Sequence, residues 1–221
     1  MHIQNFAIPQ HLPPEQAVEQ LLGIPFSALV GTAMQCHRQV KSASELQPKG
    51  SGGTLAWIFG TETLRAQLIP LGWAPADVNN QPRVVSPDGK HAITVMCGDA
   101  HTGNPKRTPC TRNKRGSQTV RSVNLNARQG DMFSELFSNV LSIAPKGGED
   151  QTLWILLFLV DKENNEVHYE LSRPVNMGEN GKVDGWSTRF IMPPLLLGAP
   201  KDHQGPPPTS PDIDIPVTPR P

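Results

Sequence analysis

The chain has 221 residues and carries 20 Lys or Arg against 20 Asp or Glu, so its formal net charge is zero. A neutral chain has no overall attraction to nucleic acid or to an anionic membrane, and any such attraction has to be local. Hydrophobic residues form 37% of the sequence, which also holds 19 glycines and 23 prolines. This composition predicts one sizeable domain with many turns and some chain outside the compact part.

The cysteines and the first residues predict the compartment. Three cysteines, Cys36, Cys97 and Cys110, are typical of a reducing environment. The N-terminal sequence MHIQNFAIPQHLPP lacks a basic segment followed by an apolar one. No run of the chain approaches the roughly 18 apolar residues that span a bilayer. We therefore expect a cytoplasmic protein with no membrane partner.

Helical signals fill the N-terminal third, residues 1–72. Pro14–Leu22 starts with a proline and an acidic residue and is followed by Gly23, which is typical of a short helix. Residues 27–40 are a second helix candidate, with Ser27 at the N-cap position. Residues 61–71 are a third, with leucines at helical spacing. Between these helices the sequence KGSGG predicts a flexible loop.

Two hairpins are expected in the second half of the chain. Residues 83–97 contain the turn sequence Pro-Asp-Gly between two short strand-like segments. Residues 153–171 begin with eight consecutive apolar residues, which favours a strand buried on both faces, and then alternate after an Asn-rich turn. Pro174 is expected to end this hairpin, because proline cannot donate to a strand ladder. A further strand is predicted at 187–192.

The remaining segments complete an α+β fold with a mostly antiparallel sheet. Residues 131–143 (DMFSELFSNVLSI) have the spacing of an amphipathic helix that packs on the sheet. The alternation at 117–126 does not decide between a strand and the start of a helix. Residues 199–221 contain eight prolines, which predicts a disordered or polyproline-like tail. We therefore predict a single domain over residues 1–198, followed by this tail.

The strongest functional signal is a basic stretch at residues 104–128. Between Asp99 and Asp131 the sequence has seven Lys or Arg and no Asp or Glu. Such a stretch attracts phosphate groups, and its Ser and Thr hydroxyls are further phosphate donors. It contains no aromatic residue for base stacking, and its Pro and Gly favour a loop over a recognition helix. The predicted nucleic-acid contacts are Lys106, Arg107, Arg112, Lys114, Arg115 and Arg121.

Two other interpretations of this stretch remain open. In the first, its cations pair with acids elsewhere in the chain, such as Glu149-Asp150, Glu163 or Glu166. Alternatively, they meet an acidic protein partner, in which case the chain is a non-catalytic interaction subunit of a larger assembly. The oligomeric state is not predicted.

Catalysis and metal binding have weaker signals. A nuclease that uses Mg²⁺ needs carboxylate ligands beside a cation, and Asp99 and Glu170 are the candidates. However, Ser172 stands where a restriction-endonuclease-like site has lysine, and Glu170 is better explained as a partner of Arg173 or Arg189. No cofactor is expected apart from that Mg²⁺.

The cysteines offer a second weak metal candidate. Cys97, His101 and Cys110 contain zinc-ligand types, but their spacing is not that of a known zinc motif. The cations around Cys110 are expected to lower the pKa of its thiol. No oxyanion site accompanies it, however, so a cysteine nucleophile is not favoured.

Overall fold

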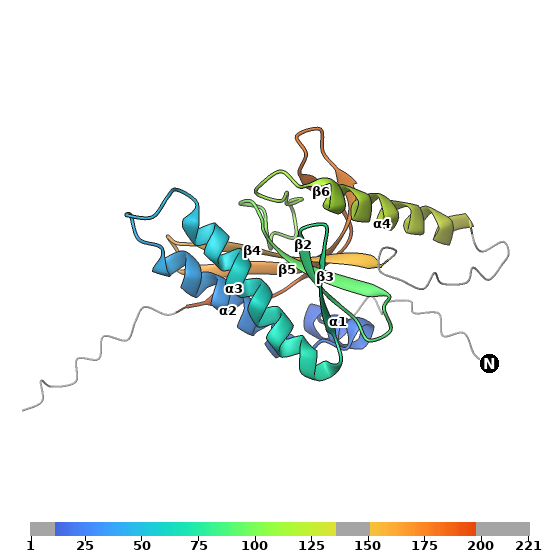
Figure 1. Ribbon diagram of the computed structural model, residues 1–221, viewed down its shortest axis with the longest axis horizontal. Helices are drawn as coiled ribbons and strands as arrows, with labels where there is room; N and C mark the ends of the chain where they lie inside the picture. Colours follow the sequence, from blue (N-terminus) through green and yellow to red (C-terminus); the bar gives the residue numbers. More distant parts are fainter. Residues whose placement is uncertain (1–11, 136–150, 198–221) are drawn as a thin grey trace, which may run out of the picture.

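The computed structural model describes residues 12–135 and 151–197. The fold is α+β, with a helical N-terminal third and a mostly antiparallel sheet, which confirms the predicted class (Figure 1). The helices are α1 (Pro14–Leu22), α2 (Phe26–Ser42), α3 (Ser51–Leu68), the short 3-10 helix η1 (Ile69–Leu71) and α4 (Ser117–Glu135). The strands are β1 (Ala74–Val78), β2 (Gln81–Val85), β3 (His91–Cys97), β4 (Thr152–Asp161), β5 (Glu166–Met177), β6 (Val183–Ile191) and β7 (Leu195–Leu196).

Helix α3 begins ten residues before the predicted helix, at the segment expected to be a flexible loop. Two of its glycines lie where α3 packs closely against α2. A Cβ on Gly52 would lie 3.2 Å from the backbone oxygen of Val40, and a Cβ on Gly60 would lie 2.6 Å from the Cys36 sulfur. Both neighbours belong to α2, so the missing side chains let the two helices approach each other. Tertiary contact therefore overrides the poor helix propensity of glycine here.

The sheet order is β1-β2-β3-β4-β5-β6, and β7 pairs with β5. The predicted hairpins are β2–β3 and β4–β5, and the predicted third strand is β6. Every pairing is antiparallel except that of β3 with β4, which is parallel because the loop and α4 cross over between them. Strand β1 was not predicted. It joins β2 through Asn79 and Asn80, which both have positive φ, as a tight two-residue hairpin turn requires.

Strand β4 is buried on both faces, as its apolar run predicts. Trp154, Leu156 and Phe158 lie in the larger core, which contains the buried residues of α1, α2 and α3. Leu153, Ile155 and Leu157 lie in a second core with Val123 of α4 and Val183 of β6. Figure 1 shows α1–α3 and α4 on opposite sides of the sheet. We call the second side the α4 face.

Helix α4 starts well before the predicted helix at 131–143 and includes the undecided segment 117–126. Residues 136–150 and the predicted tail at 199–221 lie outside the described part of the chain. The buried side of α4 is mainly polar, since Gln118, Thr119, Ser122 and Asn126 are all buried there beside Val123. Because this buried face lacks apolar residues at helical spacing, the sequence pattern does not distinguish a helix from a strand at 117–126.

The prediction that Pro174 ends the second hairpin is wrong. Strand β5 continues to Met177, with shifts in its register with β6 between Arg173 and Met177. The amide of Asn126 replaces ladder bonds at this irregular point. Its Nδ2 donates to the carbonyls of Leu153 and Pro174, both at 2.9 Å, and its Oδ1 accepts from the Leu153 N–H at 3.0 Å. A side chain of α4 therefore satisfies backbone groups that proline leaves without a donor.

Among the described residues, no single helix is long and apolar enough to cross a membrane. Helices α1 and α2 reach that length and apolarity only when taken together, and the pair is bent by 111°.

Candidate nucleic-acid interface

The basic stretch has two parts in the structure. Residues 98–116 form an irregular segment, which we call the anchored loop, and the remainder lies on α4. The anchored loop leaves the end of β3 and returns to the same place. The Asp99 N–H donates to the Cys110 carbonyl at 3.0 Å, and the Arg112 N–H donates to the Cys97 carbonyl at 2.9 Å. These bonds close the base of the loop against β3.

The middle of the anchored loop is held by a buried ion pair. Glu170 on β5 is fully buried, and Arg189 on β6 donates to both of its carboxylate oxygens, at 2.5 and 3.1 Å. The same guanidinium donates to the carbonyls of Arg107 at 2.9 Å and Asn104 at 3.1 Å. The Gly103 N–H donates to Glu170 at 3.1 Å. The sheet therefore holds three successive points of the loop backbone.

The returning half of the loop is bonded to the β5–β6 hairpin. The indole of Trp186 donates to the Pro109 carbonyl at 2.8 Å, and the Arg115 N–H donates to the Gly181 carbonyl at 2.8 Å. Thr111 accepts the Val183 N–H on its hydroxyl and donates its own N–H to the Val183 carbonyl. Despite its prolines and glycines, the loop is fixed along its length.

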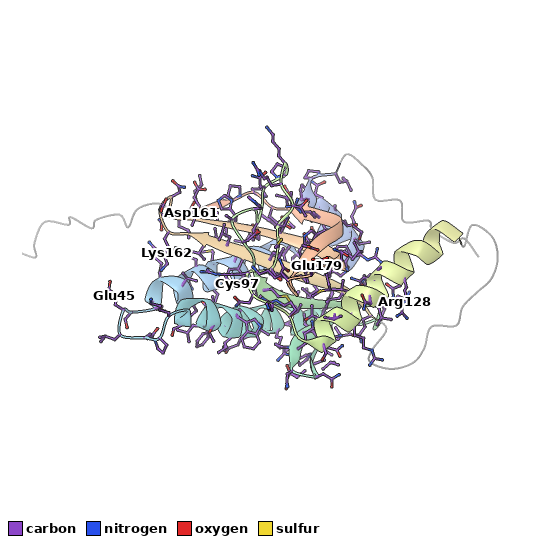
Figure 2. The ribbon with its side chains drawn as sticks, turned by 90° about the horizontal axis from the view of Figure 1, so that it is seen from above. Glu45, Cys97, Arg128, Asp161, Lys162 and Glu179 are labelled. Carbon is purple, nitrogen blue, oxygen red and sulfur yellow. The ribbon has the colours of Figure 1, made fainter. Side chains whose placement is uncertain are left out.

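Most of the predicted contact residues are exposed, four of them on the anchored loop and Arg121 on α4. The exposed cations are Lys106, Arg107, Arg112, Lys114 and Arg121. Arg115 differs, because it is partly buried and its burial lowers the pKa of its guanidinium. Within the described residues, none of the five cations of the loop forms an ion pair with a carboxylate. Figure 2 shows Cys97, at the end of β3, near the middle of the molecule and Arg128 on α4 toward one side of it.

Of the acids proposed as partners of these cations, two lie elsewhere in the structure and two lie outside its described residues. Glu166 contacts His168, with 3.5 Å between the carboxylate and the imidazole Nε2. Glu163 lies in the exposed turn between β4 and β5. Glu149 and Asp150 lie outside the described residues.

The two nuclease candidates are both engaged in structural bonds. Besides Arg189 and Gly103, the carboxylate of Glu170 accepts from the Ser172 hydroxyl at 2.8 Å. The expected pairing of Glu170 with Arg189 is present. Asp99 accepts the His101 N–H at 3.0 Å, as a turn-forming aspartate does. Within residues 12–135 and 151–197, no group of three or more His, Cys, Asp or Glu side chains lies close enough to hold a metal ion.

The zinc candidates lie around the base of the anchored loop. The Cys97 thiol faces the Gly53 carbonyl of α3 at 3.8 Å. Burial raises the pKa of this thiol, against the opposing effect of Arg112 and Arg115. Burial also raises the pKa of Cys110, and the nearby carboxylates of Asp99 and Asp184 act in the same direction. The expected lowering of the Cys110 pKa is therefore wrong, because burial, together with the two carboxylates, outweighs the opposing effect of Lys182.

In comparisons with known proteins, no family model, curated protein or solved structure matches this chain. The function is therefore inferred from the chemistry of the anchored loop and α4.

Two features of this surface were missed by sequence reasoning. One is the role of Arg189, which lies far from the loop in sequence. The other is an exposed polar stripe on α4, whose helical spacing is visible in the sequence once the helix is known.

Proposed function

We propose that this protein binds nucleic acid, with the cations of the anchored loop and of α4 contacting phosphates. The observation that carries the proposal is the state of Lys106, Arg107, Arg112 and Lys114. All four are exposed, and none of them has a carboxylate partner within the described residues. On a chain of zero net charge, a local group of cations without carboxylate partners among the described residues makes this surface attractive to phosphates.

The rigidity of the loop supports the same proposal. The backbone near the cations is held by Arg189, Trp186 and the β5–β6 hairpin. A mobile basic segment would lose conformational entropy on binding, and the hydrogen bonds that hold this loop reduce that loss. The exposed hydroxyls of Thr108 and Ser117 lie within the same surface and suit phosphate oxygens.

Arg115 has a different role within the proposed interface. Its backbone N–H bonds Gly181 and its Nε donates to the Asn113 carbonyl at 3.0 Å. Its partial burial next to Cys97 keeps it away from a bound strand. We assign it to positioning the loop and assign phosphate contact to the exposed cations.

The test is the salt dependence of duplex binding by the full chain. If four or five phosphates are neutralised, the logarithm of the affinity falls against the logarithm of the salt concentration with a slope of about −4. Replacing Arg107, Arg112 and Lys114 together by Ala is expected to make this slope shallower by about 3 units. The matched control replaces Lys41, Lys49 and Lys162, which are exposed cations on other surfaces, by Ala and leaves the slope unchanged.

A flat salt response, or equal affinity of the loop variant and the wild type, contradicts the proposal. An acidic protein partner is distinguished by capture in the presence of nuclease. A partner that remains bound after nuclease treatment, and is lost in the loop variant, indicates a protein instead of a nucleic acid.

A further inference from the structure

Helix α4 carries a stripe of exposed polar residues on its outward side. The stripe consists of Ser117, Arg121, Asn124 and Arg128, all of which are exposed. Their spacing places them within an arc of about 60° around the helix axis. The nearest carboxylates along the chain are Asp99, which precedes the stripe, and Asp131, which follows Arg128 by three residues, so no acid lies between the first and last residues of the stripe.

The opposite side of α4 fixes the rotation of the helix about its axis. Asn126 bonds the backbone of β4 and β5, and Gln118 accepts from the amide of Asn79 at 2.9 Å. Thr119 accepts from the amide of Gln81 at 2.9 Å. Directional hydrogen bonds at both ends of this face allow one orientation only, whereas apolar packing alone would tolerate small rotations. The stripe is therefore presented in a defined direction.

We infer that this stripe enters the major groove of duplex DNA and reads base edges, while the anchored loop contacts the flanking phosphates. This inference rests on the proposed function and adds its substrate class. The major groove is about 12 Å wide and admits one α-helix. Arginine and asparagine are the side chains that bond guanine and adenine edges in pairs. Arg121 and Arg128 are about 10.5 Å apart along the axis, close to three base-pair steps.

The same surface disfavours other nucleic acids. The deep and narrow major groove of an RNA duplex does not admit side chains to its base edges. Single strands are usually held by aromatic side chains that stack on bases. No Phe, Tyr or Trp occurs between Cys97 and Phe133, so the anchored loop and the described side of α4 offer no stacking platform.

The experiment selects preferred sequences from a pool of randomised duplexes with the full chain, and then measures Asn124→Ala against them. This substitution removes a base-reading amide, keeps the net charge and improves helix propensity. We expect affinity for the selected duplex to fall about 5- to 150-fold, with affinity for an unrelated duplex and the salt slope unchanged. Gln47→Ala, which removes an exposed amide in the link between α2 and α3, is the control and leaves both affinities unchanged.

The outcomes separate this inference from the proposed function. If binding is salt-dependent but the pool yields no preferred sequence, or if Asn124→Ala binds the selected duplex as well as wild type, the groove-reading role of α4 is wrong while phosphate binding stands. Tighter binding of RNA or of a single strand also overturns the inference. Absence of binding to any nucleic acid at low salt overturns both proposals.

Discussion

Arg189 and Glu170 form a buried ion pair that joins the central sheet to the anchored loop. The carboxylate of Glu170 is fully buried and accepts from Arg189, Ser172 and Gly103. Arg189 uses its remaining donors on two carbonyls of the loop. Taking two charges out of water is costly, and the cost is offset only where further hydrogen bonds complete the site. Here those bonds are what hold the loop in place.

Glu170→Gln is expected to lower the free energy of unfolding by about 3–5 kcal/mol, because it leaves the Arg189 guanidinium without a counter-charge. Denaturant unfolding of the two proteins measures this difference. The double variant Glu170→Gln, Arg189→Met serves as control and is expected to lose less than the sum of the single losses. A loss below about 1 kcal/mol for Glu170→Gln would show that the pair is not coupled to folding.

Asn126→Ala is expected to cost about 3 kcal/mol, because it leaves backbone groups of Leu153 and Pro174 buried without partners. Asn124→Ala is a matched control on the same helix. Asn124 is exposed, and its replacement is expected to change stability by less than about 0.5 kcal/mol. Thermal or denaturant unfolding compares the two variants. Equal stability of both would contradict the docking role of Asn126.

The elements with strong local chemistry were predictable from the sequence. Pro87-Asp88-Gly89 predicted one hairpin, and the apolar run of β4 predicted the other together with burial on both faces. Strand β1 was missed because its sequence APADV has little strand propensity and because it depends on pairing with β2. The start of α4 was missed because its buried side consists mainly of polar residues and so lacks apolar side chains at helical spacing.

The candidate site was predictable only in part. The acid-free run of cations is a property of the sequence, but exposure and pairing depend on the fold. Arg115 shows the difference, since it belongs to the run and is nevertheless partly buried. The anchoring of the loop by Arg189 connects residues more than eighty positions apart in sequence, at Arg107 and Asn104. No local pattern records a contact of that kind.

Two glycines of α3 are expected to respond in opposite ways to the same substitution. A Cβ on Gly60 would lie 2.6 Å from the Cys36 sulfur, so Gly60→Ala is expected to cost about 1–3 kcal/mol through overpacking. A Cβ on Gly53 would meet only the Cys97 sulfur, at an ordinary 3.8 Å. Gly53→Ala is therefore expected to stabilise the protein by about 0.5–1 kcal/mol. Unfolding experiments on both variants test the assignment of these glycines, and a gain in stability for Gly60→Ala would refute it.

The pH dependence of stability is expected to include a contribution from His91. Its Nδ1 accepts a hydrogen bond from the indole of Trp154 at 3.3 Å, which requires an unprotonated Nδ1. Burial lowers the pKa of His91, partly opposed by Asp88 and reinforced by Lys90 and Arg173. Because the folded pKa lies below the unfolded value of about 6.5, the unfolded chain binds the proton more strongly.

The contribution of His91 is therefore fully present above about pH 6.5 and is lost as the pH falls below that value. His91→Asn is expected to flatten the dependence of unfolding free energy on pH between about 7 and 5. Burial also lowers the pKa of His37, so some slope remains in that variant. The comparison is made by denaturant unfolding at several pH values. An unchanged slope in His91→Asn would show that His91 takes up its proton equally well in the folded and unfolded chain.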